Sequence, residues 1–335
     1  MQRKRFAWIS VAVAAFATTV AGAAMAASTS SKDVTLNLVA YSTPRPVLTK
    51  LIDEFRKTPQ GSGVTIRASY GPSSAQGQAV ANGLPADGVI LNTGNDINNL
   101  VDKGLINRNW DKQSYNGVVW NSVVVFGLRD GNPKKIKGWN DLLKPGVQVV
   151  TVNPFTGGIA KWNILSAYVA QRRLGKTDKQ AIAYLKKFFQ HVPVQPDSAR
   201  AALQVFAQGK GDVLITYENE AIYAEKKGVH TEYKTPKSTL LIETPVALTK
   251  TGLQKPAAKA FYKYLWSATA QKAFAAQGFR PVLPSVAKHY KFYKPAGLFT
   301  ITSTKLGLNG WTKVQTRFFH PQNGIVAKIE KSLGH

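Results

Sequence analysis

The amino-acid sequence predicts an α/β protein whose sheets are built mainly from parallel strands. Segments in which apolar and polar residues alternate are followed repeatedly by segments with helical spacing, and such strand–helix units are typical of parallel sheets. The units form two sets, one on each side of a β-branched run at residues 122–128. Because 335 residues suffice for two cores of ordinary size, we expect two α/β domains.

The first set begins with a half-buried strand, in which Val34, Leu36 and Leu38 alternate with Thr35 and Asn37. Apolar residues at helical spacing follow, and the pattern then repeats twice. In chain order, the predicted elements are strand 34–38, helix 48–55, strand 64–68, helix 75–81, strand 88–91 and helix 96–103.

Two β-rich segments are predicted to cross between the domains. Residues 122–128 end at a Gly-Asn-Pro break, and residues 239–248 are again rich in β-branched residues. Between them we expect strand 147–152, helices 160–174, 179–189 and 199–208, strand 212–216 and helix 219–227. Helices 256–266 and 269–277 then cover the first domain. Aromatic residues are expected to pin the tail to the body; they are Phe279, Tyr290, Phe292, Tyr293, Trp311, Phe318 and Phe319.

The first 26 residues predict a secretory signal peptide. Residues 3–5 are basic, an apolar stretch follows, and Ala24-Met25-Ala26 fits a cleavage site after Ala26. A membrane anchor is the alternative, but the stretch is short and weakly apolar for a span. The sequence has no cysteine, which excludes a lipid-bearing cysteine, disulfides and thiol nucleophiles. We therefore expect a freely diffusing periplasmic protein.

The charge balance favours anionic partners but does not indicate which anion is bound. Lys and Arg number 44 against 18 Asp and Glu, a formal net charge of +26, which creates a field that attracts anions of any kind. The basic residues are scattered singly and in pairs, so they indicate a solvated surface and no nucleic-acid tail.

Enzyme signatures are missing from the sequence. It contains no G-x-S-x-G, Walker or H-E-x-x-H motif, and its five histidines show no metal-ligand spacing. Glu218 and Glu220 are two positions apart on a predicted helix and therefore point in different directions. We expect no enzymatic activity, no metal and no cofactor.

Four junctions between strands and helices consist almost entirely of small and hydroxyl residues. They are Tyr41-Ser42-Thr43, Gly71-Pro72-Ser73-Ser74, Thr156-Gly157-Gly158 and Asp197-Ser198-Ala199. Such junctions can be ordinary helix caps, and Asp197 is assigned to capping. They can also expose the first N–H groups of helices to an oxyanion at the carboxyl ends of strands. Uncharged donors suit a fully ionised tetrahedral anion, which offers only acceptors.

Several longer motifs resemble those of the periplasmic sulfate/thiosulfate-binding proteins of ABC importers. They are Gly138-Trp139-Asn140-Asp141-Leu142-Leu143-Lys144-Pro145-Gly146, Asn153-Pro154 with Ala160-Lys161-Trp162-Asn163, Gly211-Asp212-Val213-Leu214-Ile215 with Glu218-Asn219-Glu220-Ala221, Gly278-Phe279-Arg280-Pro281, Leu298-Phe299-Thr300-Ile301 and Gly310-Trp311-Thr312-Lys313. The likeness spans nearly the whole chain after the signal segment.

This resemblance implies a two-lobed periplasmic binding protein of type II, with crossing hinge strands and a ligand cleft between the lobes. Residues 33–121 and 243–300 would form lobe 1, residues 122–242 lobe 2, and residues 301–335 a tail packed on the body. The implied partners are sulfate or a related oxyanion and the importer permease in the membrane. We expect a monomer that binds no nucleic acid.

The resemblance also implies a set of binding residues. Ser73, the amides of the loop after Thr156, Ala199 or Ser198, and Tyr217 in place of a tryptophan match ligand-binding positions of the family. Together with the residues of the four junctions, these positions give the predicted binding set, which is Ser42, Ser73, Ser74, Thr156, Gly157, Gly158, Ser198, Ala199 and Tyr217.

Besides Tyr217, three residues depart from the family pattern. Ser42 replaces an aspartate, Gly157 a hydroxyl residue, and Ile159 a small residue. Two alternatives to sulfate therefore stay open. One is a binding protein for another small anion or an organic sulfonate, and the other is a basic exported protein that adheres to polyanions.

Overall fold

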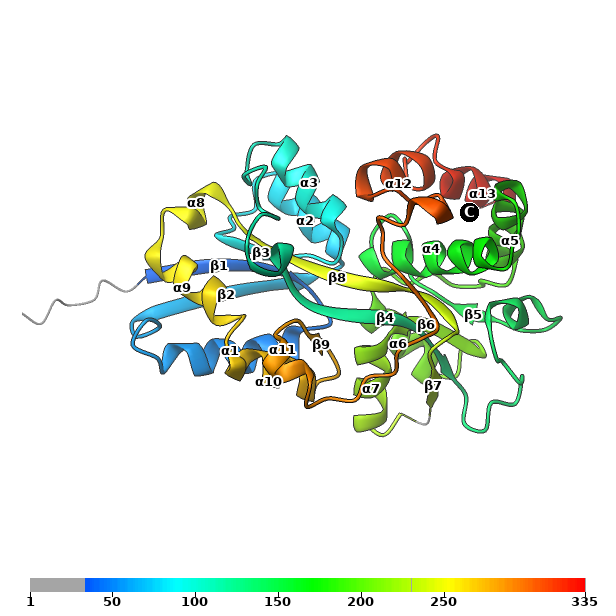
Figure 1. Ribbon diagram of the computed structural model, residues 1–335, viewed down its shortest axis with the longest axis horizontal. Helices are drawn as coiled ribbons and strands as arrows, with labels where there is room; N and C mark the ends of the chain where they lie inside the picture. Colours follow the sequence, from blue (N-terminus) through cyan, green and yellow to red (C-terminus); the bar gives the residue numbers. More distant parts are fainter. Residues whose placement is uncertain (1–33, 230, 335) are drawn as a thin grey trace, which may run out of the picture. The chain divides into compact units, whose positions relative to one another are not determined.

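A computed structural model describes residues 34–229 and 231–334 (Figure 1). The predicted signal peptide therefore lies outside the described residues. Within the described ranges, no helix combines the length and apolarity needed to cross a membrane.

The described strands form one continuous sheet in the order β2-β1-β3-β8-β4-β6-β5. At one end, β1 (Val34–Tyr41) pairs in parallel with β2 (Val64–Gly71) and β3 (Gly88–Ile90). At the other end, β5 (Val149–Val150) and β6 (Val213–Tyr217) are also parallel. The predicted parallel α/β units are confirmed, although β5 is much shorter than strand 147–152.

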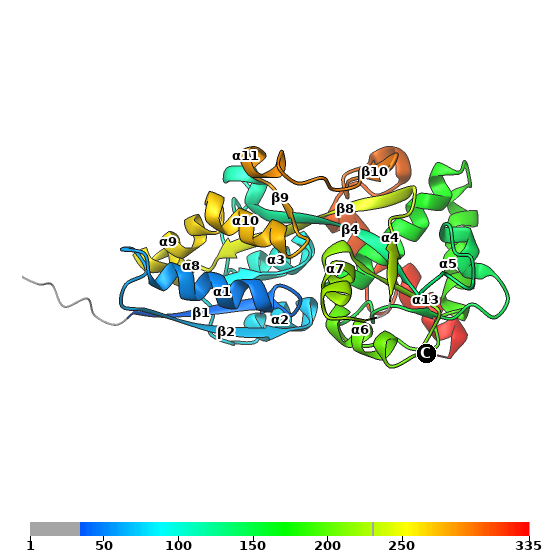
Figure 2. The ribbon, with the colours of Figure 1, turned by 90° about the horizontal axis from the view of Figure 1, so that it is seen from below.

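Two long strands join the two ends of the sheet. The first half of β4 (Val118–Leu128) pairs antiparallel with β8 (Ser238–Leu248), and its second half pairs with β6. The last residues of β8 pair with β3. Figures 1 and 2 show β4 and β8 running side by side from one lobe into the other. The predicted crossing strands are confirmed. The predicted lobe boundaries stay a prediction, since the described residues pack as one unit.

Helices cover both faces of the sheet in each lobe (Figure 1). The first lobe carries α1 (Arg45–Arg56), α2 (Ser73–Ala81), α3 (Gly94–Asp102), α8 (Lys250–Leu253), α9 (Pro256–Tyr264), α10 (Ala268–Ala276) and α11 (Pro284–Ala287). The second carries α4 (Gly158–Arg173), α5 (Asp178–Gln190), α6 (Ala199–Ala207) and α7 (Glu218–Lys226). Short elements are η1 (Ser114–Gly117), η2 (Trp139–Leu143), β7 (Glu232–Lys234), β9 (Arg280–Pro281), β10 (Gly297–Phe299) and η3 (Thr304–Leu306).

The C-terminal helices α12 (Trp311–Phe318) and α13 (Ile325–Leu333) pack against α3 and α5. The rings of Trp311 and Trp162 pack edge-on with their centroids 4.8 Å apart, and those of Phe318 and Tyr168 do so at 5.0 Å. Tail contacts of this kind help to explain why α4 is buried from Gly158 to Gln171.

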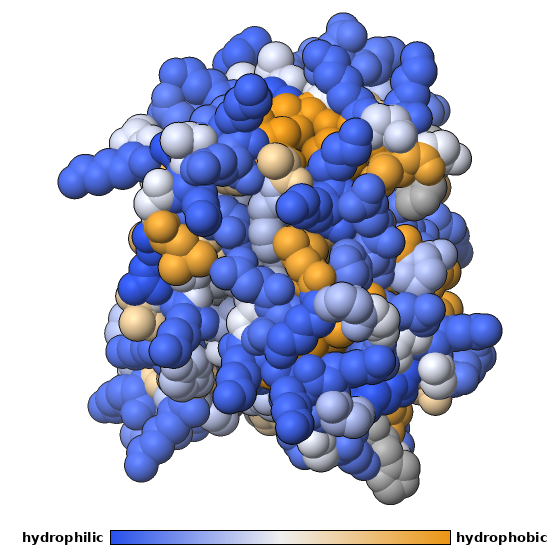
Figure 3. Space-filling view, turned by 90° about the vertical axis from the view of Figure 1, so that its right-hand side faces the viewer, coloured by the Kyte–Doolittle hydropathy of each residue, from blue (hydrophilic) through white to orange (hydrophobic). Residues whose placement is uncertain are grey.

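One aromatic residue expected to pin the tail does not do so. The side chain of Tyr293 is 56% exposed, and its backbone carbonyl accepts a hydrogen bond from Arg280 instead. The face of the second lobe in Figure 3 is mostly hydrophilic with small apolar patches, which fits a solvated surface.

Candidate functional site

Three helices begin at predicted site residues. Ser73 is the first residue of α2, Gly158 of α4 and Ala199 of α6, and all three are buried. The residues before α2 and α4, Pro72 and Gly157, provide no side-chain cap. In the first turns, the N–H of Ala160 donates to the Gly157 carbonyl and the N–H of Ser74 to the Thr156 carbonyl, each at 3.1 Å. The remaining N–H groups at the beginnings of these two helices have no side-chain cap, and the positive ends of the helix dipoles favour an anion.

The beginnings of α2 and α4 lie in direct contact, although they belong to different lobes. The Ser74 N–H donates to the carbonyl of Thr156 at 3.1 Å. A Cβ added at Gly158 would lie 3.2 Å from the Cβ of Ser73. The structure thus brings together four of the predicted residues.

The beginning of α6 lies against the loop before α4. The hydroxyl of Thr156 donates to the carbonyl of Asp197 at 3.1 Å, and a Cβ at Gly157 would lie 2.9 Å from that same carbonyl. The assignment of Asp197 to capping is wrong. Ser198, in extended conformation, is the N-cap, and its hydroxyl accepts from the N–H of Ala201 at 3.2 Å.

Tyr217 ends β6 immediately before α7 and is 2% exposed. Its ring centroid lies 6.0 Å from that of Tyr41. Burial, followed by the proximity of Tyr41, Glu220 and Asp96, raises the pKa of Tyr217 well above 10. The phenol therefore keeps its proton and stays a hydrogen-bond donor.

Ser42 is less closely connected to the other predicted residues. It is half-buried between β1 and α1, and its carbonyl accepts from the N–H of Arg45 at 3.2 Å. Among the described residues, no hydrogen bond joins it to the other eight predicted positions. Its neighbour Tyr41, however, contacts Tyr217.

A buried charge pair stands behind the serines of α2, and sequence reasoning missed it. Asp96 of α3 accepts hydrogen bonds from the hydroxyls of Ser73 at 2.8 Å and Ser74 at 3.0 Å. The ammonium of Lys161, from α4, lies 3.7 Å from Asp96 and 3.4 Å from the Ser74 hydroxyl. Two charged side chains, Asp96 and Lys161, therefore lie beside the predicted serines of α2.

Both residues lie in the first turns of helices, Asp96 in α3 and Lys161 in α4, and outside the four junctions rich in small and hydroxyl residues. Thr93 caps α3, and its hydroxyl accepts from the N–H of Asp96 at 3.2 Å. The spacing Thr93-x-x-Asp96 is the start signal of a helix and could have placed Asp96 in a first turn. The pairing with Lys161, 65 positions away along the chain, leaves no such local signal.

These contacts decide which groups remain available for an anion. The single hydroxyl proton of Ser73 goes to Asp96, and its oxygen accepts from the Asn92 N–H at 2.8 Å. The Thr156 hydroxyl is likewise committed to Asp197. Since a hydroxyl has only one proton to donate, the hydroxyls of Ser73 and Thr156 are not available to an anion, whereas backbone N–H groups at the beginnings of α2 and α4 are.

Arg200, the second residue of α6, is already neutralised within the protein. It makes two hydrogen bonds with Glu220 of α7, at 3.0 and 2.8 Å. Burial raises the pKa of Glu220, and Arg200 opposes that rise. The pair joins the beginnings of α6 and α7. No cluster of three or more acidic or histidine side chains suited to a metal occurs in the described ranges.

Comparison of the chain with known proteins identifies its family. Residues 36–280 match the family model described as bacterial extracellular solute-binding protein. The chain belongs to this family. The resemblance to its sulfate/thiosulfate-binding members is confirmed by two relatives. The sulfate-binding protein of Synechococcus elongatus is 37% identical over 91% of this chain and 89% of the relative. The thiosulfate-binding protein of Pseudomonas aeruginosa is 36% identical over 79% and 82%.

A solved structure confirms the fold class. The sulfate-binding protein SubI from Mycobacterium tuberculosis H37Rv superposes with a TM-score of 0.81 and 41% identity. The match covers 86% of this chain and 100% of that chain. The two-lobed, type II fold predicted for this solute-binding protein is therefore confirmed.

A further contact holds the lobes of this solute-binding protein together. The indole N–H of Trp162, in α4, donates to the carbonyl of Asn92, after β3, at 3.1 Å. Ile159, three residues before Trp162 in α4, is 1% exposed and belongs to the main hydrophobic core. Both side chains are therefore buried, and that of Trp162 bonds to the first lobe.

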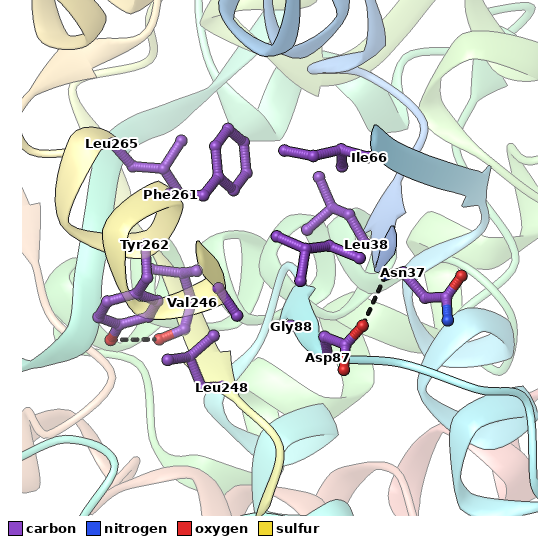
Figure 4. Close-up of a pocket in the computed structure, with 12 residues that line it drawn as sticks. Asn37, Leu38, Ile66, Asp87, Gly88, Val246, Leu248, Phe261, Tyr262 and Leu265 are labelled. Atoms are coloured by element: carbon purple, nitrogen blue, oxygen red, sulfur yellow. Dashed lines mark hydrogen bonds between the residues drawn. The ribbon is translucent and has the colours of Figure 1, made fainter. Parts of the chain in front are cut away.

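An apolar cavity of about 20 Å³ lies elsewhere, between the sheet of the first lobe and α9 (Figure 4). Leu36, Ile66 and Phe261 are among its apolar lining residues. At its edge, the carboxylate of Asp87 accepts from the N–H of Asn37 at 2.8 Å. A small apolar space beside a carboxylate does not suit an anion, so this cavity belongs to the core.

Proposed function

We propose that this solute-binding protein captures a fully ionised tetrahedral oxyanion, sulfate or thiosulfate, and delivers it to an ABC importer. The observation that carries the proposal is the meeting of two uncapped helix N-termini, those of α2 and α4, at Ser73 and Gly158. Tyr217 adds a phenol that stays protonated, and α6 begins beside the same loop. The relatives' names supply the ligand class.

The proposed donors fit the chemistry of such an anion. Sulfate offers only acceptors, which backbone N–H groups and a phenol satisfy without a countercharge. The contacts between α2 and α4 would close over the bound ion, exclude water and thereby strengthen each hydrogen bond. The proposed set remains Ser42, Ser73, Ser74, Thr156, Gly157, Gly158, Ser198, Ala199 and Tyr217.

The proposal includes an exported carrier. Cleavage after Ala26 and the lack of a lipid-bearing cysteine would release a periplasmic monomer without enzymatic activity. Its other partner would be the permease of the importer. Export is tested by N-terminal sequencing of the protein recovered outside the cytoplasm, which should begin at Ala27.

Titration calorimetry of the purified protein with sulfate, thiosulfate, phosphate and molybdate tests the ligand. We expect tight binding of sulfate or thiosulfate and weak binding of the other two. If none of the four anions binds, the oxyanion proposal fails. Polyanion adhesion is separated by a salt titration, because it should weaken steeply with salt whereas a buried site should respond only weakly.

A Ser73→Ala variant tests the position of the site. The change removes the hydroxyl that holds both Asp96 and the Asn92 N–H, so the first turn of α2 should lose its orientation. We expect sulfate affinity to fall several-fold, whereas Ser62→Ala, an exposed serine in the turn before β2, should leave it unchanged. Unchanged affinity in Ser73→Ala would place the site elsewhere.

A further inference from the structure

Asn92 occupies the point at which α2, α4 and the end of β3 meet. It is 0% exposed. Both of its backbone groups are used there, since its N–H donates to the Ser73 hydroxyl at 2.8 Å and its carbonyl accepts from Trp162 at 3.1 Å. The residue is thus held rigidly by one group from each lobe.

The side chain of Asn92, in contrast, has no partner among the described residues. Neither its Nδ2 nor its Oδ1 makes a hydrogen bond there. A carboxamide offers two donors and an acceptor, and buried polar groups in folded proteins are nearly always hydrogen-bonded. The elements that surround this carboxamide provide no hydrogen-bond partner, which leaves both of its polar atoms available to a group from outside the chain.

The position of the carboxamide indicates what that partner is. A Cβ added at Gly158 would lie 3.0 Å from the Oδ1 of Asn92 and 3.2 Å from the Cβ of Ser73. The carboxamide therefore lies between the first residues of α2 and α4, where two uncapped helix N-termini meet. A group bound at this place would be an anion.

Two other buried asparagines do not combine an unpartnered Nδ2 with a place beside Ser73 and Gly158, as Asn92 does. Asn163 has its Nδ2 bonded to Thr151 and to the carbonyl of Ile215, both at 3.0 Å. Asn95 is also buried with an unpartnered Nδ2. It lines a neighbouring space with Ser74, Asp96 and Lys161, and Asn92, Ser73 and Gly158 do not line that space.

We propose that the carboxamide of Asn92 is a direct ligand of the bound oxyanion, with Nδ2 donating to one of its oxygens. The inference rests on the proposed function and adds a neutral side-chain donor to it. Because the donor is uncharged, it suits a dianion without protons. A carboxylate at the same position would repel that dianion and would accept a hydrogen bond only from a protonated oxyanion.

The test compares Asn92→Ala, the isosteric Asn92→Asp and the matched control Asn95→Ala by titration calorimetry with sulfate and with inorganic phosphate. We expect Asn92→Ala to weaken sulfate binding about ten-fold, the loss of one hydrogen bond to a charged group. Asn92→Asp should weaken it further and shift the preference toward hydrogen phosphate. Asn95→Ala should bind sulfate as the unchanged protein does.

Thermal unfolding without ligand separates binding from folding. Removing an unsatisfied amide should leave the unfolding midpoint of Asn92→Ala unchanged or higher, whereas a purely structural role would lower it. If Asn92→Ala does not fold, the isosteric Asp variant supplies the measurement. The inference is overturned if the unchanged protein binds sulfate and the Asn92 variants bind it equally well. If the unchanged protein binds none of sulfate, thiosulfate, phosphate and molybdate, the proposed function itself falls, and the inference falls with it.

Discussion

At the scale of single residues, the lack of a side chain at position 158 lets the two lobes meet. A Cβ there would lie 2.9 Å from the Cβ of Asn92 and 3.2 Å from the Cβ of Ser73. Both neighbours are buried and tied by backbone hydrogen bonds. Neither can move away easily, so a side chain at this position would have to push α4 from α2.

Replacement of Gly158 by alanine should therefore weaken sulfate binding by at least ten-fold, because the first turns of the two helices would no longer reach one anion together. The matched control is Gly138→Ala. Gly138 has extended backbone, with φ −168°, and a Cβ there would meet nothing within 4 Å, so its affinity should not change. Calorimetry of both variants is the measurement. Equal affinities would contradict a site at the meeting of α2 and α4.

At the scale of elements, buried ion pairs connect the first turns of helices in the second lobe to neighbouring elements. Glu218, the first residue of α7, receives two hydrogen bonds from Arg280 of β9, at 2.6 and 2.8 Å. Glu218 is 1% and Arg280 8% exposed. Since β9 pairs with β4, this contact joins α7 to the crossing strand.

Truncation of Glu218 to alanine should lower the free energy of unfolding by about 3–5 kcal/mol, because it leaves the guanidinium of Arg280 buried without its counter-ion. The control is Glu54→Ala, which removes the surface pair with Lys50, a side chain that is 70% exposed. That change should cost about 1 kcal/mol at most. Urea unfolding measures both. A loss for Glu218→Ala no greater than that of the control would show that the buried pair adds no stability.

At the scale of the whole molecule, the large positive charge and the proposed site have separate roles. The net charge of +26 attracts anions from a distance. The proposed donors, in contrast, are backbone N–H groups and a phenol whose pKa burial raises well above 10. None of these groups gains or loses a proton near neutral pH.

Sulfate affinity at constant ionic strength should accordingly stay the same between about pH 6 and pH 8.5. Tyr217 titrates only well above that window, so its phenol donates throughout it. Calorimetry across the window, with buffers of equal salt content, checks this. A ten-fold change in affinity would indicate a titrating ligand and would contradict a cage of neutral donors.

Much of the fold could be predicted from the sequence because its signals are local. The alternation of Val34, Leu36 and Leu38 marks one buried strand face, and the β-branched run in β4 marks a crossing strand. Helix ends were less accurate: α2 begins at Ser73 and not at residue 75, because the extended Pro72 ends the preceding loop there. Ser73 and Gly158 could be predicted as site residues because the small and hydroxyl residues of their junctions are adjacent in the sequence.

By itself, the sequence determined the α/β class, the paired crossing strands and the positions of the glycine- and serine-rich loops, since each depends on residues a few positions apart. Only the tertiary structure decided which groups those loops leave free. Asp96 takes the hydroxyl protons of α2, Lys161 reaches Asp96 from the other lobe, and Asn92 keeps an unpartnered carboxamide. Hydrogen bonding and burial at such a junction depend on partners 19 to 70 positions apart, which no local pattern encodes.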